Sequence, residues 1–328
     1  MAPRLPPRGF FTKSRFVPNS PNIGRTRIDE IRGWNVSRQV IFSCYVSSHS
    51  GRHQRVDECS HCLALGPPAS SILLGTVRTG RMRLLVLSDL HANLTALEAS
   101  LDAAKGSWER VVCLGDVVGY GPDPNEVTTR IRELGAATIR GNHDKAVADL
   151  MSTEDFNPVA KMAVNWTRSQ LSNENLDWLA ALPQGPLEAE GVVLVHGAFQ
   201  DEDEYVFTPT QALEGLLDSS LPVTFYGHTH HQGGFAYQDS QLEVLQLHPR
   251  NNEIRSVLRV EAEKRYLLNP GSVGQPRDSD PRAGFAIADL EHQVVEFWRV
   301  PYEIGKVQER MRKARLPEPL VHRLSLGR

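Results

Sequence analysis

The sequence predicts an α/β domain of two packed β-sheets with helices outside, which occupies residues 82–328. Three observations lead to this prediction. From residue 83 to about residue 144, apolar strands alternate with amphipathic helices, and this βαβαβ order implies parallel pairing. After residue 235 short strands follow one another without long helices, which indicates an antiparallel or mixed second sheet. Side chains that bind metal ions stand where the predicted strands end.

The first half of this domain alternates between strand and helix. The continuous apolar run RLLVLSD at 83–89 is typical of a strand that is buried on both faces. The segment after it places Leu94, Leu97 and Leu101 on one stripe of a helix. The same alternation then continues with a strand at 110–116, a helix at 125–134 and a strand within 136–144.

The remaining segments complete both sheets and their helices. Two helices are expected within 158–182, because Pro158 stands near one start and Pro183 follows the other end. Strands at 191–197 and 223–230 enclose a helix at 208–218. The last expected elements are short strands at 242–247, 256–262, 265–271, 284–290 and 294–300, and a helix at 302–314.

Residues 1–81 differ in composition from the rest of the chain. They contain twelve Lys and Arg and four Asp and Glu, which gives a formal charge of +8. The remaining residues contain 24 Lys and Arg and 35 Asp and Glu, which gives −11. An Arg- and Ser-rich, acid-poor segment is typical of organellar transit peptides. The strand that begins directly after Met82 favours a different interpretation, a translation start at that methionine. We therefore expect residues 1–81 to be an N-terminal extension that is disordered or results from a mis-assigned start.

Composition also excludes several classes of protein. No apolar run reaches the roughly 18 residues that span a bilayer, so we expect no membrane association. Cys113 is the only cysteine beyond residue 62, and a domain without a disulfide framework fits a cytoplasmic location. The acidic charge of residues 82–328 argues against binding to duplex nucleic acid, and the composition is compatible with a homo-oligomer.

The predicted strand ends share residues that can bind metal ions. In two places the spacing is i and i+2, which in extended backbone directs both side chains to the same face. Sites in open α/β sheets form outside the carboxyl ends of the strands, so we expect these side chains to converge. The candidate ligands are Asp89, His91, Asp116, Asn142, His196, His228 and His230.

The chemistry of these ligands predicts two divalent ions. Carboxylate and amide oxygens combined with imidazoles, without thiolates, suit Mn²⁺, Fe²⁺ or Zn²⁺. Seven ligands are too many for one tetrahedral ion, but they suit two ions about 3.5–4 Å apart that share a carboxylate. We expect Asp116 to be this bridge, Mn²⁺ to be the ion, and Fe²⁺, Zn²⁺ or Ni²⁺ to be alternatives. Neighbouring glycines let the backbone turn sharply there: Gly115, Gly141, Gly197 and Gly227.

The blocks DLH, GD, GNHD, VHG and GHTH appear in this order, and from Met82 onward the chain resembles the calcineurin-like metallophosphoesterase superfamily. The resemblance implies a four-layer α/β/β/α sandwich of two mixed sheets flanked by helices. The segments SDLHAN, GYGPDPNEV and NPGSVGQPRD are more similar to the bacterial branch of small phosphodiesterases and diadenosine-tetraphosphatase relatives. GDVVGYG lacks the arginine of the GDxVDRG block in protein Ser/Thr phosphatases, which argues against a phosphoprotein substrate.

The resemblance also implies a role for each site residue. One ion is bound by Asp89, His91 and His230, the other by Asn142, His196 and His228, and Asp116 bridges both. His143 corresponds to the catalytic histidine, a general acid, and Asp144 polarises it or caps the following helix. Apart from the resemblance, Arg277 is a candidate for binding a phosphate oxygen, because a guanidinium matches phosphate geometry, and the alternative is a solvated surface arginine. Asn93 either contacts the phosphate or caps the helix after it.

The activity implied by this resemblance is hydrolysis of phosphomonoesters or phosphodiesters of small molecules, nucleotides above all. A hydroxide held between the two ions would attack phosphorus, and His143 would protonate the leaving oxygen. Two alternatives stay open at this point. One is an activity like that of protein Ser/Thr phosphatases, and the other is a non-catalytic nucleotide-binding or scaffold protein of the same fold.

Overall fold

The computed structural model describes residues 82–154, 156–250 and 253–328. The predictions for residues 1–81 therefore lie outside the described residues. In the described part of the chain, twelve strands form two six-stranded sheets, and eight helices accompany them. None of these helices is long and apolar enough to traverse a bilayer.

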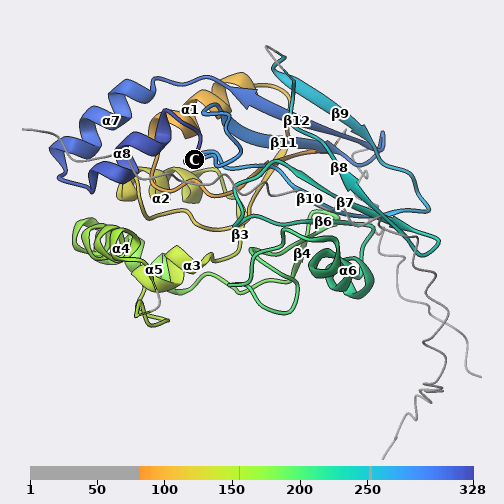
Figure 1. Cartoon of the computed structure of the whole chain (residues 1–328), viewed down its shortest axis with the longest axis horizontal. Helices are drawn as coiled ribbons and strands as arrows, with labels where there is room; N and C mark the ends of the chain where they lie inside the picture. The colour runs from red at the N-terminus through yellow and green to blue at the C-terminus, as the bar shows by residue number, and fades with distance from the viewer. Residues whose placement is uncertain (1–81, 155, 251–252) are drawn as a thin grey trace, which may run out of the picture. The chain divides into compact units, whose positions relative to one another are not determined.

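The first sheet is mixed and has the strand order β3-β2-β1-β11-β12-β9 (Figure 1). The first three strands along the chain pair in parallel, whereas β11 joins β1 antiparallel and continues into β12 and β9. The strands are β1 (Arg83–Leu87), β2 (Arg110–Cys113), β3 (Ala137–Thr138), β9 (Arg255–Arg259), β11 (Ala283–Asp289) and β12 (Val294–Val300).

The second sheet is also mixed, in the order β4-β5-β6-β10-β7-β8. Its strands are β4 (Leu187–Ala189), β5 (Val192–Leu194), β6 (Val223–Phe225), β7 (Gly233–Gln238), β8 (Gln241–Leu245) and β10 (Arg265–Asn269). The prediction that the strands after residue 235 make a sheet of their own is wrong, because three of them complete the first sheet. The apolar strand β1 needs a neighbour on each side, and β11 is the second neighbour.

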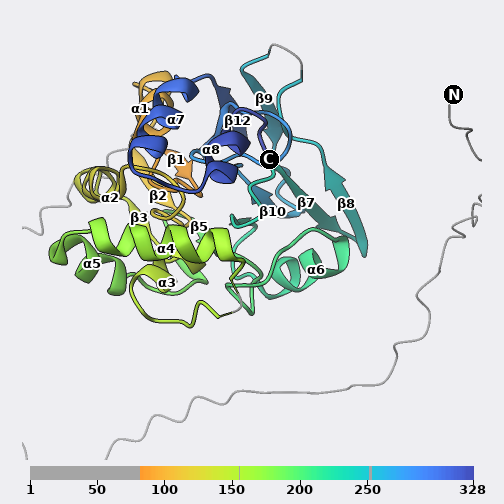
Figure 2. The same cartoon turned by 60° about the vertical axis from the view of Figure 1, so that its left-hand side comes forward.

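Helices cover the outer faces of both sheets (Figures 1 and 2). The helix α1 packs against β11 and β12, and α6 packs against β7, β8 and β10. The short helices α3 and α8 did not emerge from the sequence, since neither is long enough to show a clear period. The bounds are α1 (Leu94–Ala103), α2 (Pro124–Glu133), α3 (Asn142–Val147), α4 (Pro158–Gln170), α5 (Asn173–Ala180), α6 (Pro209–Asp218), α7 (Ile304–Lys313) and α8 (Glu318–Leu324).

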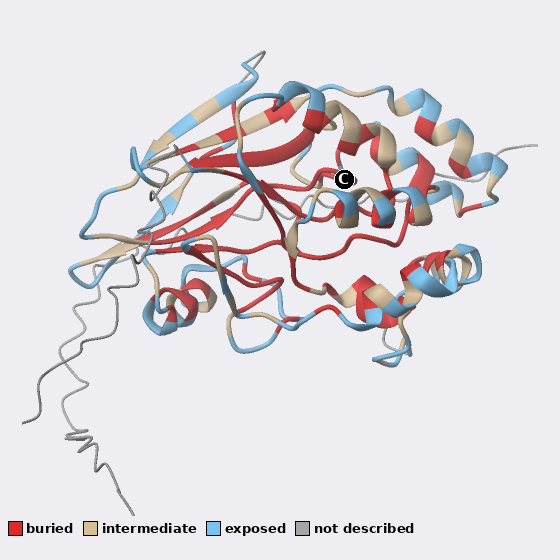
Figure 3. Cartoon of the chain, turned by 180° about the vertical axis from the view of Figure 1, so that it is seen from behind, coloured by how far each residue is buried: buried red, intermediate tan, exposed pale blue. Residues whose placement is uncertain are grey.

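The core of the described residues comprises three clusters between the four layers of secondary structure and a fourth cluster that packs α4, α7 and α8 together. Leu84 and Val86 of β1 pack between the two sheets, and Leu85 and Leu87 point to the helix side, as the period of a strand requires. A separate cluster packs α6 on the second sheet. Figure 3 shows the same pattern: strands such as β1 and β11 are buried along most of their length, the edge strands β8 and β9 are partly exposed, and helices are buried on one face. The predicted α/β/β/α sandwich is therefore confirmed.

Candidate metal centre

The predicted ligands lie in the turns that follow the strands and not at the last residues of the strands. The strand β1 stops at Leu87 and β6 at Phe225, so the extended-backbone reason given for the i and i+2 spacing is wrong. Instead, five of the ligands have the left-handed backbone that side chains other than glycine rarely adopt. Their φ values are 52° at Asp89, 45° at His91, 51° at Asp116, 63° at His228 and 59° at His230.

Backbone hydrogen bonds hold the first two of these turns side by side. The amide of Asp89 donates to Gly115 O at 3.1 Å, and the amide of His91 donates to Asp116 O at 2.9 Å. These bonds continue the parallel pairing of β1 and β2 past the ends of both strands. The side chains of the two turns are consequently fixed relative to one another by the backbone.

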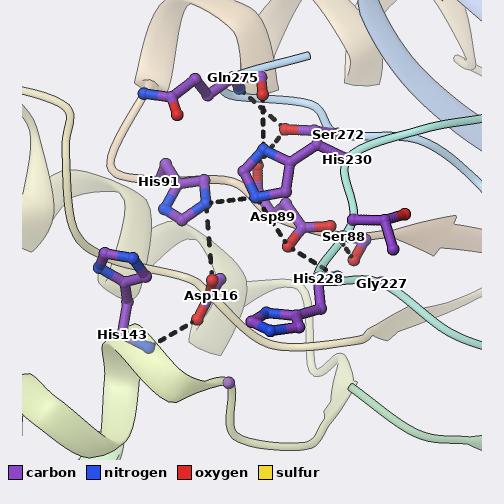
Figure 4. A network of polar contacts seen from close by, with 12 residues as sticks. Ser88, Asp89, His91, Asp116, His143, Gly227, His228, His230, Ser272 and Gln275 are labelled. Atoms are coloured by element: carbon purple, nitrogen blue, oxygen red, sulfur yellow. Dashed lines mark hydrogen bonds and ion pairs between the residues drawn. The ribbon is translucent and has the colours of Figure 1, made fainter. Parts of the chain in front are cut away.

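The structure brings the predicted ligands into two buried groups that share one member. Figure 4 shows the first group, together with His228 of the second. The ligand atoms of each group all lie within 4.8 Å of one another. The first group comprises Asp89, His91, Asp116 and His230, and the second comprises Asp116, His196 and His228. The predicted ligand Asn142 adjoins the second group, since its Oδ1 is 3.4 Å from His196 Nε2.

Asp116 lies between the two groups in the way a bridging carboxylate would. Its Oδ2 is 3.6 Å from His91 Nε2 and also 3.6 Å from His196 Nε2. Its Oδ1 accepts a hydrogen bond from the backbone N–H of His143 at 2.9 Å. One oxygen is thus fixed by the start of α3, and the other is equally near to both histidines.

Hydrogen bonds select the imidazole nitrogen that each histidine presents to the cluster. A backbone carbonyl only accepts, so the ring nitrogen beside it carries the proton and leaves the lone pair on the other nitrogen. His228 donates from Nε2 to Asp203 O at 3.1 Å, which leaves its Nδ1 free for a metal ion. The other three histidines donate from Nδ1 to a backbone oxygen. The distances are 3.2 Å from His91 to Val118 O, 2.7 Å from His196 to Leu114 O and 2.6 Å from His230 to Gln275 O.

Burial opposes charge at this cluster, and divalent cations would relieve that opposition. Burial raises the pKa of Asp89 to about 7 and raises the pKa of Asp116 well above its ordinary value. Burial also lowers the pKa of His91 and His230, so both imidazoles are neutral at pH 7, as metal ligands must be. The donor set therefore fits hard divalent ions of the Mn²⁺, Fe²⁺ or Zn²⁺ type.

A cavity of about 280 Å³ opens over these groups. Arg277 lines it, and so does His143, so the structure places both predicted residues beside the ligands. Asn93 is not in the cavity lining: its Oδ1 caps α1 by accepting from Ala96 N at 3.1 Å. The lining includes Asp116, Tyr120, Asn142, His143, Asp203, Tyr205, His228, His230 and Arg277.

Asp144 does not polarise His143, which corrects the expectation from the sequence. The carboxylate of Asp144 accepts from three backbone N–H groups, those of Val117, Val118 and Gly141, at 3.0–3.3 Å. Among the described residues, the Nδ1 of His143 has no hydrogen-bond partner. Asp144 therefore acts as the cap of α3 and holds the turn after Asp116 in place.

Three residues beside the ligands were not foreseen from the sequence. Tyr205 stacks on His228, with ring centroids 3.9 Å apart and an angle of 15° between the planes. Asp203 accepts from His228, and Gln275 accepts from His230, both through the backbone carbonyl. Since a backbone carbonyl carries no residue-specific pattern, no sequence signal could identify these last two.

The segment from Asn269 to Asp278 supports the ligands through its backbone. Gly274 N donates to Asp89 O at 2.9 Å, and Ser272 Oγ donates to the same oxygen at 2.8 Å. Gly274 packs so closely that a Cβ there would lie 1.8 Å from Leu90 O. The left-handed turn at Asp89 thus rests directly on this segment.

Substitution of Gly274 by Ala should displace the turn that carries Asp89 and His91. Overpacking of this kind typically costs about 1–3 kcal/mol of stability. We expect a lower melting temperature and a metal content reduced by about one ion per chain, measured by thermal unfolding and elemental analysis. Gly305→Ala is the matched control, since a Cβ at Gly305 meets no atom within 4 Å among the described residues. An unchanged metal content in Gly274→Ala would contradict the supporting role of this segment.

Comparisons with known proteins identify relatives of this chain. The chain is 35% identical over 247 residues to MJ0912 of Methanocaldococcus jannaschii, a match that covers 74% of this chain and 97% of that protein. A metallophosphoesterase of Sphaerobacter thermophilus has a similar structure, with a TM-score of 0.64 and 40% identity, over 76% of this chain and all of the other (100%). PH1004 of Pyrococcus horikoshii shares the fold, with a TM-score of 0.60 and 20% identity, over 75% of this chain and 99% of the other.

The family model described as the calcineurin-like phosphoesterase superfamily domain matches residues 82–293. This range includes β1 to β11 and every residue of the two ligand groups. The family and the buried Asp and His cluster together indicate binding of divalent metal. The chain belongs to the calcineurin-like phosphoesterase superfamily.

Proposed function

We propose that this protein hydrolyses phosphoester bonds of small phosphorylated molecules, nucleotides above all, at a centre of two divalent metal ions, with Mn²⁺ as the expected ion. The observation that carries the proposal is the position of Asp116 Oδ2, 3.6 Å from a histidine nitrogen of each ligand group. This shared oxygen lies at a cavity that His143 and Arg277 also line. A phosphoryl group in the cavity would lie beside the predicted metal ligands and also beside His143 and Arg277.

The protein's own part in this reaction is to bind, orient and protonate. When bound, two divalent ions supply Lewis acidity and lower the pKa of water toward neutrality. Arg277 offers a planar guanidinium that matches phosphate oxygens, and its Cζ lies 5.8 Å from the centroid of the Tyr120 ring. The guanidinium and the Tyr120 ring are thus within cation–π range at the cavity that both residues line.

His143 is the residue we propose as proton donor to the leaving oxygen. Burial lowers its pKa to about 3, with Arg277 as the next cause, so the imidazole is neutral at pH 7 before substrate binds. A phosphate anion in the cavity offsets the positive charge of Arg277 and favours the protonated imidazole. Burial opposes the protonated imidazole that proton donation requires, and a bound phosphate anion favours it.

Two exposed aromatic rings beside the cavity support a nucleotide substrate. Tyr205 and Phe207 are 40% and 55% exposed, and their rings stack with centroids 5.4 Å apart at 18°. Phe207 also lines an adjacent cavity of about 430 Å³, which Arg277 lines as well. A flat base could stack on this pair while its phosphate reaches Arg277.

Replacement of Phe207 by Ala should weaken binding of nucleotides. Stacking of a base on an aromatic ring is worth about 1–3 kcal/mol, so we expect the KM for AMP to rise about tenfold. Ribose 5-phosphate has no base, and its KM is the internal reference in steady-state assays. A second exposed side chain, Met162, provides the control variant Met162→Ala. Equal changes in KM for AMP and ribose 5-phosphate would remove the support for a base-stacking surface.

A substrate screen tests the proposed function. The full chain, supplied with Mn²⁺, is assayed against nucleotides, cyclic nucleotides, dinucleoside polyphosphates and phosphopeptides, with metal-free protein as background. We expect turnover of one or more of the nucleotide compounds and little turnover of phosphopeptides. Preference for phosphopeptides would favour the phosphatase alternative, and binding of nucleotides without turnover would favour a non-catalytic role.

A further inference from the structure

A second arginine, Arg323 of α8, lies beside Arg277. Both guanidinium groups donate to one acceptor, the side-chain oxygen of Gln275, at 3.2 Å from Arg277 Nη2 and 3.3 Å from Arg323 Nη1. Gln275 is 1% exposed, so its amide is fixed. The orientation of this amide follows from the two arginines, since a flipped amide would direct its NH₂ at two cations. The shared oxygen therefore holds the two positive groups together.

No carboxylate neutralises this pair. Among residues 82–154, 156–250 and 253–328, neither Arg277 nor Arg323 forms an ion pair within 4.0 Å. Burial lowers the pKa of Arg323, and the positive charge of Arg277 lowers it further. In the same part of the chain, two buried donors have no partner, Arg277 Nε and Gln275 Nε2. Two adjacent cations with spare donors are the mark of a site for an anion.

The carboxylates that Arg277 does influence belong to the ligand groups. Its charge contributes to lowering the pKa of Asp89 and of Asp116, although burial has the larger, opposite effect on both. Two further carboxylates line cavities together with Arg277, but each pairs with another cation, Asp203 with Lys145 and Asp278 with Arg299.

One member of the pair, Arg277, lines the same cavity as the metal ligands, together with Tyr120 and Tyr205. Arg323 is not among the residues that line this cavity, and it is linked to the cavity wall through the Gln275 oxygen that it shares with Arg277. The helix α8 packs its apolar side chains in the same cluster as Tyr120. Because α8 begins at Glu318, it lies beyond the residues that the family model matches. The second arginine thus comes from a segment that follows the range matched by the family model.

We propose that Arg277 and Arg323 together bind a second phosphoryl group, next to the one at the metal ligands. The preferred substrates would then carry a pyrophosphate or a longer phosphate chain, as nucleoside diphosphates do. This inference rests on the proposed function and specifies its substrate class. Guanidinium groups suit the role because their planar donors match phosphate oxygens and they keep their charge at every physiological pH.

A comparison of ADP with AMP tests the inference by activity. The two share base and sugar, so the ratio of their kcat/KM values isolates the second phosphate. We expect the Mn²⁺-loaded full chain to prefer ADP and Arg323→Gln to lose about tenfold of this preference. Arg323→Lys should retain more of it than Arg323→Gln, because it keeps the charge. The matched control is Arg259→Gln, an exposed arginine on β9, which should leave the ratio unchanged.

Thermal unfolding of metal-free protein provides a second readout that does not depend on turnover. With a chelator present, inorganic pyrophosphate should raise the melting temperature of wild type by about 2–5 °C more than inorganic phosphate does. This difference should shrink in Arg323→Gln and persist in Arg259→Gln. If neither ADP nor AMP is hydrolysed, the proposed function fails, and the unfolding comparison alone decides the inference. An unchanged ADP preference, or an equal effect of pyrophosphate on wild type and Arg323→Gln, would overturn it.

Discussion

Substitution of Asp116 by Asn is expected to abolish the binding of one metal ion and to reduce kcat/KM by about 10³-fold or more. The Oδ1 of asparagine can still accept from His143 N, as the aspartate does at 2.9 Å. This bond would place the NH₂ group where Oδ2 now lies, 3.6 Å from His91 Nε2 and from His196 Nε2. An NH₂ group offers no lone pair to a metal ion and carries no charge. The expected fall in kcat/KM corresponds to the loss of several kcal/mol of charge stabilisation in the transition state.

Metal content by elemental analysis and steady-state kinetics measure this effect in the same preparation. Asp102→Asn on the exposed side of α1 is the matched control, because it removes one negative charge outside the cavity lining. Thermal unfolding under a chelator shows whether the variant still folds. Full activity together with two bound ions in Asp116→Asn would show that the shared oxygen is not a bridge.

Replacement of His143 by Ala is expected to reduce kcat by about 10²–10⁴-fold while both metal ions remain bound. The side chain of His143 belongs to neither ligand group, although it lines the same cavity. Loss of a proton donor matters most when the leaving oxygen is strongly basic. The reduction should therefore be at least about tenfold greater for AMP, which releases an alkoxide, than for p-nitrophenyl phosphate.

His292→Ala, at an exposed histidine that pairs with Asp289, is the control for this variant. A simple structural defect in His143→Ala would lower turnover of both substrates by the same factor. Equal losses would therefore count against proton donation, and loss of metal would place His143 among the ligands.

Several parts of the fold followed from local patterns in the sequence. The apolar run of β1 and the stripe of Leu97 and Leu101 on α1 are buried as predicted. Pro158 begins α4, and Thr208 caps α6, because both residues favour the first positions of a helix. Local signals of this kind depend on neighbours along the chain, which a single sequence contains.

Other parts depend on contacts between distant segments, and the sequence did not contain them. The insertion of β11 beside β1 pairs residues about 200 positions apart, such as Leu85 with Ile287. The left-handed turn at Asp89 is held by Gly115 and Gly274, which come from two other loops. Arg323 is an unremarkable arginine in the sequence, and only the packing of α8 brings it beside Gln275.

The number and arrangement of metal ions in the full chain test the proposed dinuclear centre most directly. Protein loaded with Mn²⁺ and freed of excess metal is examined by elemental analysis and electron paramagnetic resonance. Thiolates are soft ligands, so Cys59 and Cys62 are not expected to add Mn²⁺ to the count. We expect two ions per chain with a spin-coupled spectrum, as a shared carboxylate requires. One ion, none, or two magnetically isolated ions would contradict this expectation.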